Sequence, residues 1–135
     1  MNKNKTSIVF TGDIGFDRYM DKRWEDDNLL SKPVLDFFHS ADHVVANVEG
    51  ALIDAVDDGS RGVFFHSMNP AATKVLQDMH ADIWSIGNNH TMDAGVEGVI
   101  STKKIAKELG PGKNVVTTIV DRRDRYLSET PFEKY

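Results

Sequence analysis

The sequence contains no cysteine. Disulfide bonds and thiolate metal sites are therefore excluded, and a bound metal would have to be held by Asp, Glu, Asn or His side chains. These ligands suit hard and borderline divalent cations. Because a chain without cysteine folds as well in an oxidising compartment as in a reducing one, this absence leaves the compartment open.

The sequence also has no long apolar run and no excess of positive charge. No run approaches the roughly 20 apolar residues of a membrane-spanning helix. The apolar residues 8–10, which follow a basic start, are too few for the core of a signal peptide. These two features predict a cytoplasmic protein. The formal net charge is −5 at pH 7 and no basic patch is visible, so we expect no nucleic-acid partner.

What the sequence does contain is ordinary for a globular chain, with 40% hydrophobic and 27% charged residues in a length of 135. This length is sufficient for one domain with a real core. Strands are expected at residues 7–11, 43–48, 63–66, 82–86 and 115–120, and helices at about residues 31–38, 69–79 and 93–109. The alternation predicts an α/β layered fold with a largely parallel sheet flanked by helices.

The apolar residues of these elements are expected to face the core. On the first and third expected helices and the fourth expected strand they are Val34, Leu35, Phe37, Phe38, Trp84, Val96, Val99, Ile100, Ile105 and Leu109. The polar stretch from Asp17 to Asn28 is poorly periodic and is expected to be a loop or a short helix.

Polar side chains follow three of the expected strands. Asp13 follows the first strand, Asn47 and Glu49 end the second, and residues 88–90 follow the fourth. In open α/β sheets, ligands bind beyond the carboxyl ends of the strands. We therefore expect the three clusters to converge on one site.

Asp13 and Glu49 are the carboxylates of this expected site. Asp13 could ligate a divalent cation directly after a buried strand, although a turn residue or helix cap is the commoner role of such an Asp. Glu49 lies two residues after Asn47, so both side chains would point to the same side of a strand. A carboxylate there can bridge two cations, whereas the simpler interpretation is that both residues begin a polar loop.

Asn88, Asn89 and His90 form the most informative stretch. An amide carbonyl can ligate a metal without adding charge, and an adjacent imidazole can donate a proton to a leaving oxygen, but the same residue types also form plain turns. Asp93 could orient His90 by accepting a ring proton, although a helix cap is the simpler interpretation. His66 ends an expected strand at the same edge and could contact substrate or hold a ligand in place.

Three segments of the chain form an ordered series of motifs: residues 11–14 (TGDI), 46–52 (ANVEGAL) and 86–95 (IGNNHTMDAG). The series resembles the bacterial capsule synthesis family of the CapA type. That family is associated with poly-γ-glutamate capsules and has a calcineurin-like metallophosphoesterase fold. The resemblance covers about residues 7–109, and residues 88–98 are its most specific part.

The resemblance implies a role for each matching residue. It identifies Asp13 as a metal ligand, Glu49 as the carboxylate that bridges two metals, Asn89 as an amide ligand and His90 as the proton donor or transition-state stabiliser. Asn47 and Asn88 would contact substrate or support the ligands. The implied cofactors are two divalent cations, of manganese, zinc, iron or magnesium, and the implied reaction is hydrolysis of a phosphoester or of an amide linkage in polyglutamate.

The chain departs from the wider superfamily at Gly15, where a histidine is usual. It also lacks the later histidines of the family, so we expect residues 1–112 to be the N-terminal half of the domain and residues 113–135 a divergent tail. Metal affinity should then be weak.

Two other interpretations are a non-enzymatic component that binds or assembles the anionic capsule polymer, and an inactive truncated remnant that self-associates through its exposed sheet. The resemblance further implies other capsule-synthesis proteins as partners and, for family members, frequent membrane anchoring or export.

Overall fold

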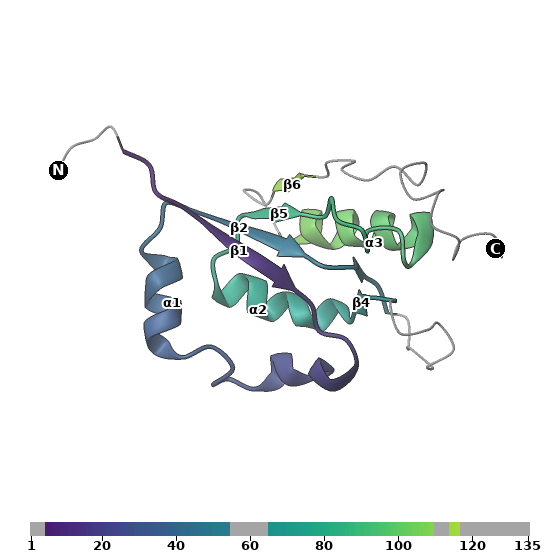
Figure 1. The fold of residues 1–135 in the computed structure, drawn as a ribbon, viewed down its shortest axis with the longest axis horizontal. Helices are drawn as coiled ribbons and strands as arrows, with labels where there is room; N and C mark the ends of the chain where they lie inside the picture. The colour runs from purple at the N-terminus through teal and green to yellow at the C-terminus, as the bar shows by residue number, and fades with distance from the viewer. Residues whose placement is uncertain (1–4, 55–64, 110–113, 117–135) are drawn as a thin grey trace, which may run out of the picture.

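The computed structural model describes residues 5–54, 65–109 and 114–116. Their main feature is a four-stranded sheet in the order β1-β2-β5-β6, in which every neighbouring pair is parallel (Figure 1). A separate pair, β3 and β4, is also parallel. The strands are β1 (Ile8–Ile14), β2 (His43–Val48), β3 (Ala51–Leu52), β4 (Ser67–Met68), β5 (Ile83–Ser85) and β6 (Asn114–Val116). This confirms the predicted α/β fold with a parallel sheet.

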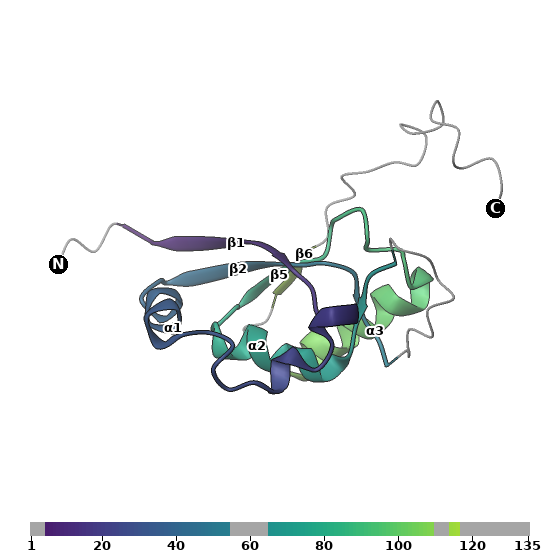
Figure 2. The ribbon, with the colours of Figure 1, turned by 60° about the horizontal axis from the view of Figure 1, so that its bottom comes forward.

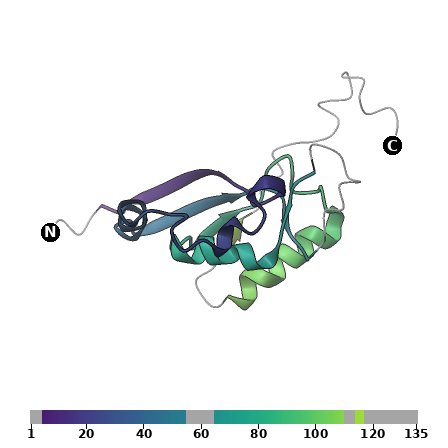
Figure 3. The ribbon, with the colours of Figure 1, turned by 90° about the horizontal axis from the view of Figure 1, so that it is seen from below.

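The helices of the described residues lie on one side of the four-stranded sheet (Figures 2 and 3). They are α1 (Lys32–His39), α2 (Thr73–Asp78) and α3 (Gly95–Glu108), together with the 3-10 helices η1 (Arg18–Met20), η2 (Arg23–Glu25) and η3 (Pro70–Ala72). None of these helices covers the opposite face of the sheet. The polar stretch from Asp17 to Asn28 thus contains two short helical turns, as expected.

The core lies between the sheet and its helices. Alternate residues of β2, namely Val44, Ala46 and Val48, are buried, because successive side chains of a strand point to opposite faces. They pack with Trp84 of β5 and Leu76 of α2. The expectation that Trp84 belongs to the core is therefore confirmed.

Strand β1 differs from the prediction because it does not end before Asp13. It continues to Ile14, with an irregularity in its pairing to β2 between Phe10 and Asp13. The physical reason is that β2 is long enough to keep pairing, so Asp13 lies beside Asn47 within the sheet and not in a loop beyond it.

Two other predicted strands are only partly covered by the described residues. Residues 63 and 64 lie outside them, and His66 lies just before β4 rather than inside a strand. Strand β6 covers the start of the strand predicted at 115–120, whereas residues 117–135, most of the expected tail, lie outside the described part of the chain. No helix in that described part is long and apolar enough to cross a membrane.

The predicted apolar faces of two helices are partly wrong. On α1, Phe38 packs against the core, but Val34 is 40% exposed and Phe37 is 58% exposed. This helix lies toward one end of the sheet (Figure 1), and its second row of apolar side chains is left exposed by the described residues.

On α3, the predicted core residues Val96 and Ile100 are 63% and 60% exposed, although Val99, Ile105 and Leu109 do pack against the core. The residues that are fully buried are Gly98, Thr102 and Ala106, which recur every four positions. A Cβ atom at Gly98 would lie 2.8 Å from the Cβ atom of Ala51. Helix α3 therefore approaches β3 through its smallest side chains, because larger ones would not fit.

Candidate metal centre

The polar residues at the carboxyl ends of the strands form a hydrogen-bonded row. Asn47 donates a hydrogen bond from its amide to Asp13 Oδ1. Asn88 in turn donates from its Nδ2 to Asn47 Oδ1 at 3.2 Å and to the Val48 carbonyl at 2.8 Å. The backbone N–H of His90 donates to Asn88 Oδ1 at 3.0 Å. Three segments distant in the sequence are thus held at one edge of the sheet.

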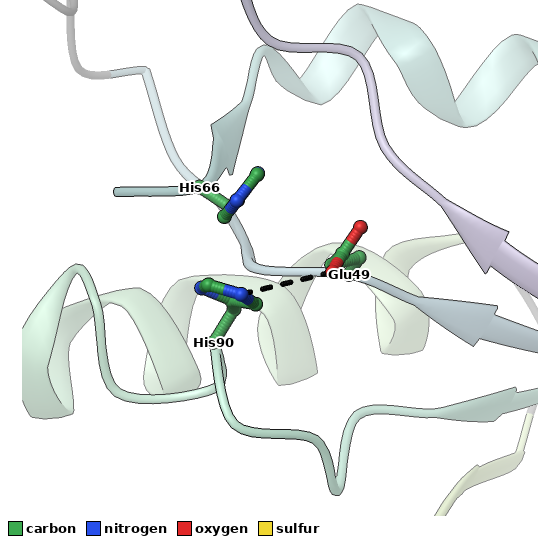
Figure 4. Close-up of side chains that lie close together, drawn as sticks. All are labelled: Glu49, His66 and His90. Carbon is green, nitrogen blue, oxygen red and sulfur yellow. Dashed lines mark ion pairs between the residues drawn. The ribbon is translucent and has the colours of Figure 1, made fainter. Parts of the chain in front are cut away.

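Next to this row, Glu49, His66 and His90 come together (Figure 4). One potential ligand atom from each lies within 4.8 Å of the other two, and all three residues are half-buried. His90 Nε2 is 3.7 Å from Glu49 Oε1. The two imidazole rings meet edge to face, with their centroids 4.0 Å apart and their planes at 71°.

Each imidazole is also contacted by a carboxylate at its Nδ1 atom. Asp93 Oδ2 lies 2.7 Å from His90 Nδ1 and accepts a second hydrogen bond from the backbone N–H of His66 at 2.8 Å. Asp17 Oδ2 lies 2.7 Å from His66 Nδ1. At His90 the contact is a hydrogen bond. A carboxylate that accepts such a bond fixes the proton on that ring nitrogen and leaves the other nitrogen with its lone pair, which is how metal-binding histidines are usually supported.

The simpler interpretation of Asp93 as a helix cap is wrong. Helix α3 begins at Gly95, its N-cap is Ala94, and no side chain caps it. The carboxylate of Asp93 is engaged by His90 and by the backbone of His66 instead. Its place therefore favours the alternative, in which it orients the imidazole.

Asp17 adds an incompletely satisfied carboxylate to the group. Its Oδ2 atom is buried and accepts no hydrogen bond of good geometry, although His66 Nδ1 is only 2.7 Å away. The N–H bond at His66 Nδ1 therefore does not point toward Asp17 Oδ2. Buried carboxylate oxygens are normally satisfied, so a small rotation of His66 that completes this bond would be favourable.

Two glycines allow the backbone to bring these residues together. Gly50 directly after Glu49 has a positive φ of 82°, and a Cβ atom there would overlap the carbonyl oxygen of His66. Gly15 lies beside the Glu49 carboxylate, since a Cβ atom at this position would be 3.6 Å from Glu49 Oε2. Gly15, where the sequence departs from the pattern expected above, thus faces Glu49.

The group fits a divalent cation on the chemistry of its donors. Two nitrogen ligands and one carboxylate oxygen suit zinc, manganese or iron. Ligand atoms on one such ion are about 3–4 Å apart, which agrees with the 3.7 Å between His90 and Glu49. Asp17 and Asp93 would add negative charge next to the ligands.

The structure thus brings Glu49, His66 and His90 together, with Asp93 and Asp17 behind the two rings. Asp13 is not a member of the metal-compatible group in the described residues; it lies in the row with Asn47 and Asn88. Asn89 is exposed. The binding of a metal by Asp13 and Asn89 stays a prediction.

Asp17 was not among the residues that the sequence singled out. It lies in a stretch without hydrophobic period, and it meets His66 only because the chain folds back from η1 to the loop before β4. No local pattern around Asp17 or His66 marks this contact. His66 itself was expected to contact substrate or support a ligand, whereas its position is also that of a potential ligand.

Comparison with known proteins gives two results. The family described as "Bacterial capsule synthesis protein PGA_cap" matches residues 7–111. The chain is also 32% identical over 99 residues to the PGA biosynthesis protein CapA of Bacillus subtilis (strain 168). That alignment covers 71% of this chain but only 26% of the relative, so the chain spans a small part of the relative's length.

Proposed function

The chain belongs to the family of bacterial capsule synthesis proteins, and from this premise we propose that it carries a metal-dependent hydrolase site that acts in capsule biosynthesis. The observation that supports the proposal is the group of Glu49, His66 and His90 at the carboxyl edge of a parallel sheet. This is the edge at which open α/β sheets bind their ligands.

In this proposal Glu49 and the two histidines hold one divalent cation. When bound, such a cation supplies polarisation of a substrate oxygen and activation of water. Asp93 keeps the proton of His90 on Nδ1, so that Nε2 faces Glu49. The predicted second cation would share Glu49 and require Asp13 and Asn89, and the stoichiometry of metal binding tests that part separately.

Two roles for His90 have to be separated. The resemblance implies a proton donor, whereas the geometry also suits a metal ligand. If His90 is a ligand, His90→Ala lowers the metal affinity and the activity together. If it is a proton donor, the same variant keeps the metal affinity and loses turnover.

For the substrate we propose an anionic chain or a phosphoester. The relative is named for the biosynthesis of PGA, and the polymer or its phosphorylated precursors would bring negative charge to the site. Because the chain has a net charge of −5 and the site contains Glu49, Asp17 and Asp93, such a substrate requires a bound cation to offset repulsion.

The proposal is tested by calorimetric titration of the protein with Mn²⁺ or Zn²⁺ and by hydrolysis of bis-p-nitrophenyl phosphate with and without each metal. We expect binding that is lost in Glu49→Ala and in His66→Ala, and turnover that requires the metal. His39→Ala, which removes an imidazole outside the group, is the matched control and should change neither. Unchanged metal binding in both site variants would contradict the metal centre.

Metal-independent binding of polyglutamate without any turnover would instead favour a polymer-binding component. A chelator distinguishes the two functions, because it abolishes metal-dependent hydrolysis and leaves metal-independent binding of the polymer unchanged.

A further inference from the structure

The loop between β5 and α3, residues 86–94, carries His90 and is shaped by hydrogen bonds between its own residues. The Asn88 N–H donates to the Thr91 hydroxyl oxygen at 3.0 Å. The Asp93 N–H donates to the His90 carbonyl at 3.1 Å. These bonds give the loop its shape, but they do not attach it to β2.

The side chain of Asn88 makes that attachment. Its Nδ2 group donates to the Val48 carbonyl at 2.8 Å and to Asn47 Oδ1 at 3.2 Å, both at the end of β2. Its Oδ1 atom accepts the backbone N–H of His90 at 3.0 Å. Because a reversed amide would place an oxygen against two acceptors and an NH₂ group against a donor, these neighbours fix its orientation. One partly buried side chain therefore ties His90 to the end of β2.

The end of β2 is a firm anchor for this side chain. The Glu49 N–H donates to the Ile14 carbonyl of β1 at 3.0 Å, so the backbone of Glu49 is held independently of Asn88. Val48, whose carbonyl binds Asn88, directly precedes Glu49 and is fully buried. Asn88 thus links a fixed backbone group next to one candidate ligand to the backbone of the other, His90.

We propose that Asn88 is a positioning residue, which sets the place of His90 relative to Glu49 and does not contact substrate. The inference rests on the proposed function for the chemistry of the site, and it separates the two roles that the resemblance implies for Asn88. The side chain has no N–H left for a substrate, since both of its amide hydrogens are donated within the protein. The 3.7 Å between His90 Nε2 and Glu49 Oε1 follows from this link (Figure 4).

Loss of the Asn88 amide would leave the His90 N–H without its acceptor and the Val48 carbonyl without its donor. The loop would keep its internal bonds, so it would shift as a unit and not unfold. A displacement of His90 by about 1 Å is sufficient to weaken a metal site or to misplace a proton donor.

Hydrogen exchange tests the positioning in the metal-free chain, with a chelator present. In Asn88→Ala we expect the His90 backbone N–H to exchange about 10-fold faster than in the parent chain, because it loses its acceptor. The Gly95 N–H, which donates to the Met92 carbonyl at 2.8 Å, should exchange at an unchanged rate. Unchanged exchange at His90 would overturn the proposal, as would equal acceleration at both positions.

A double-mutant cycle then tests whether Asn88 acts through His90. Mn²⁺ affinity is measured by calorimetric titration and turnover with bis-p-nitrophenyl phosphate, and the cycle is evaluated on the property that His90→Ala lowers. We expect Asn88→Ala to lower this property by about 10- to 100-fold in the parent chain. In the His90→Ala chain the same change should have an effect of less than about twofold, because the residue that Asn88 positions is already absent. An equal loss in both backgrounds would indicate a general structural role and overturn the proposal.

Asp82→Asn is the matched control, because Asp82 joins the starts of β2 and β5. It contacts His43 Nδ1 at 2.7 Å and accepts the Val44 N–H at 2.9 Å. The control should leave metal affinity and turnover unchanged although it removes a link between the same two strands. If Asn88→Ala raised KM alone, with kcat and metal affinity unchanged, Asn88 would be a substrate contact and the proposal would be wrong.

Failure of the proposed function gives a different result from failure of this inference. A parent chain that binds no metal and hydrolyses nothing would contradict the proposed function, and the exchange rate at His90 would then decide the role of Asn88 by itself. An active parent chain whose affinity and turnover are unchanged by Asn88→Ala would contradict the positioning role alone.

Discussion

At the scale of single residues, Asp93 connects two parts of the candidate site. One of its oxygens contacts the ring of His90 and accepts the backbone N–H of His66. The carboxylate therefore positions one imidazole directly and the other through the main chain. Its contribution is to keep two potential ligands at a fixed separation before any ion binds.

We predict that Asp93→Asn lowers the affinity for Mn²⁺ or Zn²⁺ by about 10- to 100-fold, as is usual when the carboxylate behind a metal-binding histidine is lost. The amide has the same size, but it does not hold the proton on His90 Nδ1 as a carboxylate does. Calorimetric titration measures the effect. Asp36→Asn, which removes a carboxylate paired with Lys32 on the surface of α1, should leave the affinity unchanged; an equal loss in both variants would contradict a specific role.

A second single-residue effect lies at the opposite end of the sheet. Asp82 contacts His43 Nδ1 at 2.7 Å and accepts the Val44 N–H at 2.9 Å, so it joins the starts of β2 and β5. Partial burial raises the pKa of the Asp82 carboxyl, but the hydrogen bonds from His43 and from backbone amides outweigh burial and hold its pKa below the ordinary value of 3.8.

Because the pKa of Asp82 is lower in the folded chain, its contribution to stability is fully present above pH 3.8 and is lost as the pH falls through the lower, folded pKa. We predict that Asp82→Asn lowers the free energy of unfolding by about 1 kcal/mol at neutral pH, a value reduced for its partial exposure. Urea unfolding of both proteins measures this difference, which should shrink as the pH is lowered below 3.8. A difference independent of pH would show that the charge is not involved.

At the scale of elements, α3 shows that burial can select small size over hydrophobic character. Its buried row is Gly98, Thr102 and Ala106, and the Thr102 hydroxyl accepts the Leu52 N–H at 2.8 Å while it donates to the Gly98 carbonyl at 2.9 Å. The helix thus satisfies a backbone group of β3 with its own side chain. Close contact of backbones and a buried hydrogen bond determine this interface.

We predict that Gly98→Val destabilises the fold by about 1–3 kcal/mol, because an added Cβ atom would lie 2.8 Å from the Cβ of Ala51 and would push α3 away from β3. The loss would occur although valine is a better helix former than glycine. Chemical denaturation measures it. Glu97→Val, at the exposed neighbouring position, should change stability by less than about 0.5 kcal/mol; equal effects at both positions would exclude the packing explanation.

At the scale of the whole molecule, the candidate metal centre joins three parts of the chain. Glu49 follows β2, His66 precedes β4, and His90 lies in the loop after β5. An ion held by all three would bind the folded chain and not the unfolded one. Metal binding should therefore be coupled to the stability of the entire fold.

We predict that Zn²⁺ or Mn²⁺ raises the melting temperature, with a stabilisation of about 2.7 kcal/mol when the free metal is 100 times the dissociation constant. Thermal unfolding with and without metal measures the shift. His66→Ala should abolish it and His39→Ala should retain it. A shift of the same size in His66→Ala would mean that the metal acts elsewhere on the acidic surface.

The sequence alone predicted the features that depend on neighbouring residues. The strand periodicity of residues 43–48, the helical spacing after Asn69 and the motif around His90 are local patterns, and they led to the parallel α/β fold and to Glu49 and His90 as candidates. The capsule synthesis family was likewise identified from local motifs and is confirmed by the family match. These features are local because hydrogen bonds within an element and the direction of its side chains repeat with a fixed period.

Only the tertiary structure decided which distant segments meet. It placed His66 beside Glu49 and His90, put Asp17 behind His66, and buried Gly98 where the apolar pattern favoured Val96. It also left one face and one edge of the sheet open among the described residues. The physical reason is that such contacts depend on the distance between backbones far apart in the chain, and this distance is set by the packing of the whole core rather than by the residues adjacent in sequence.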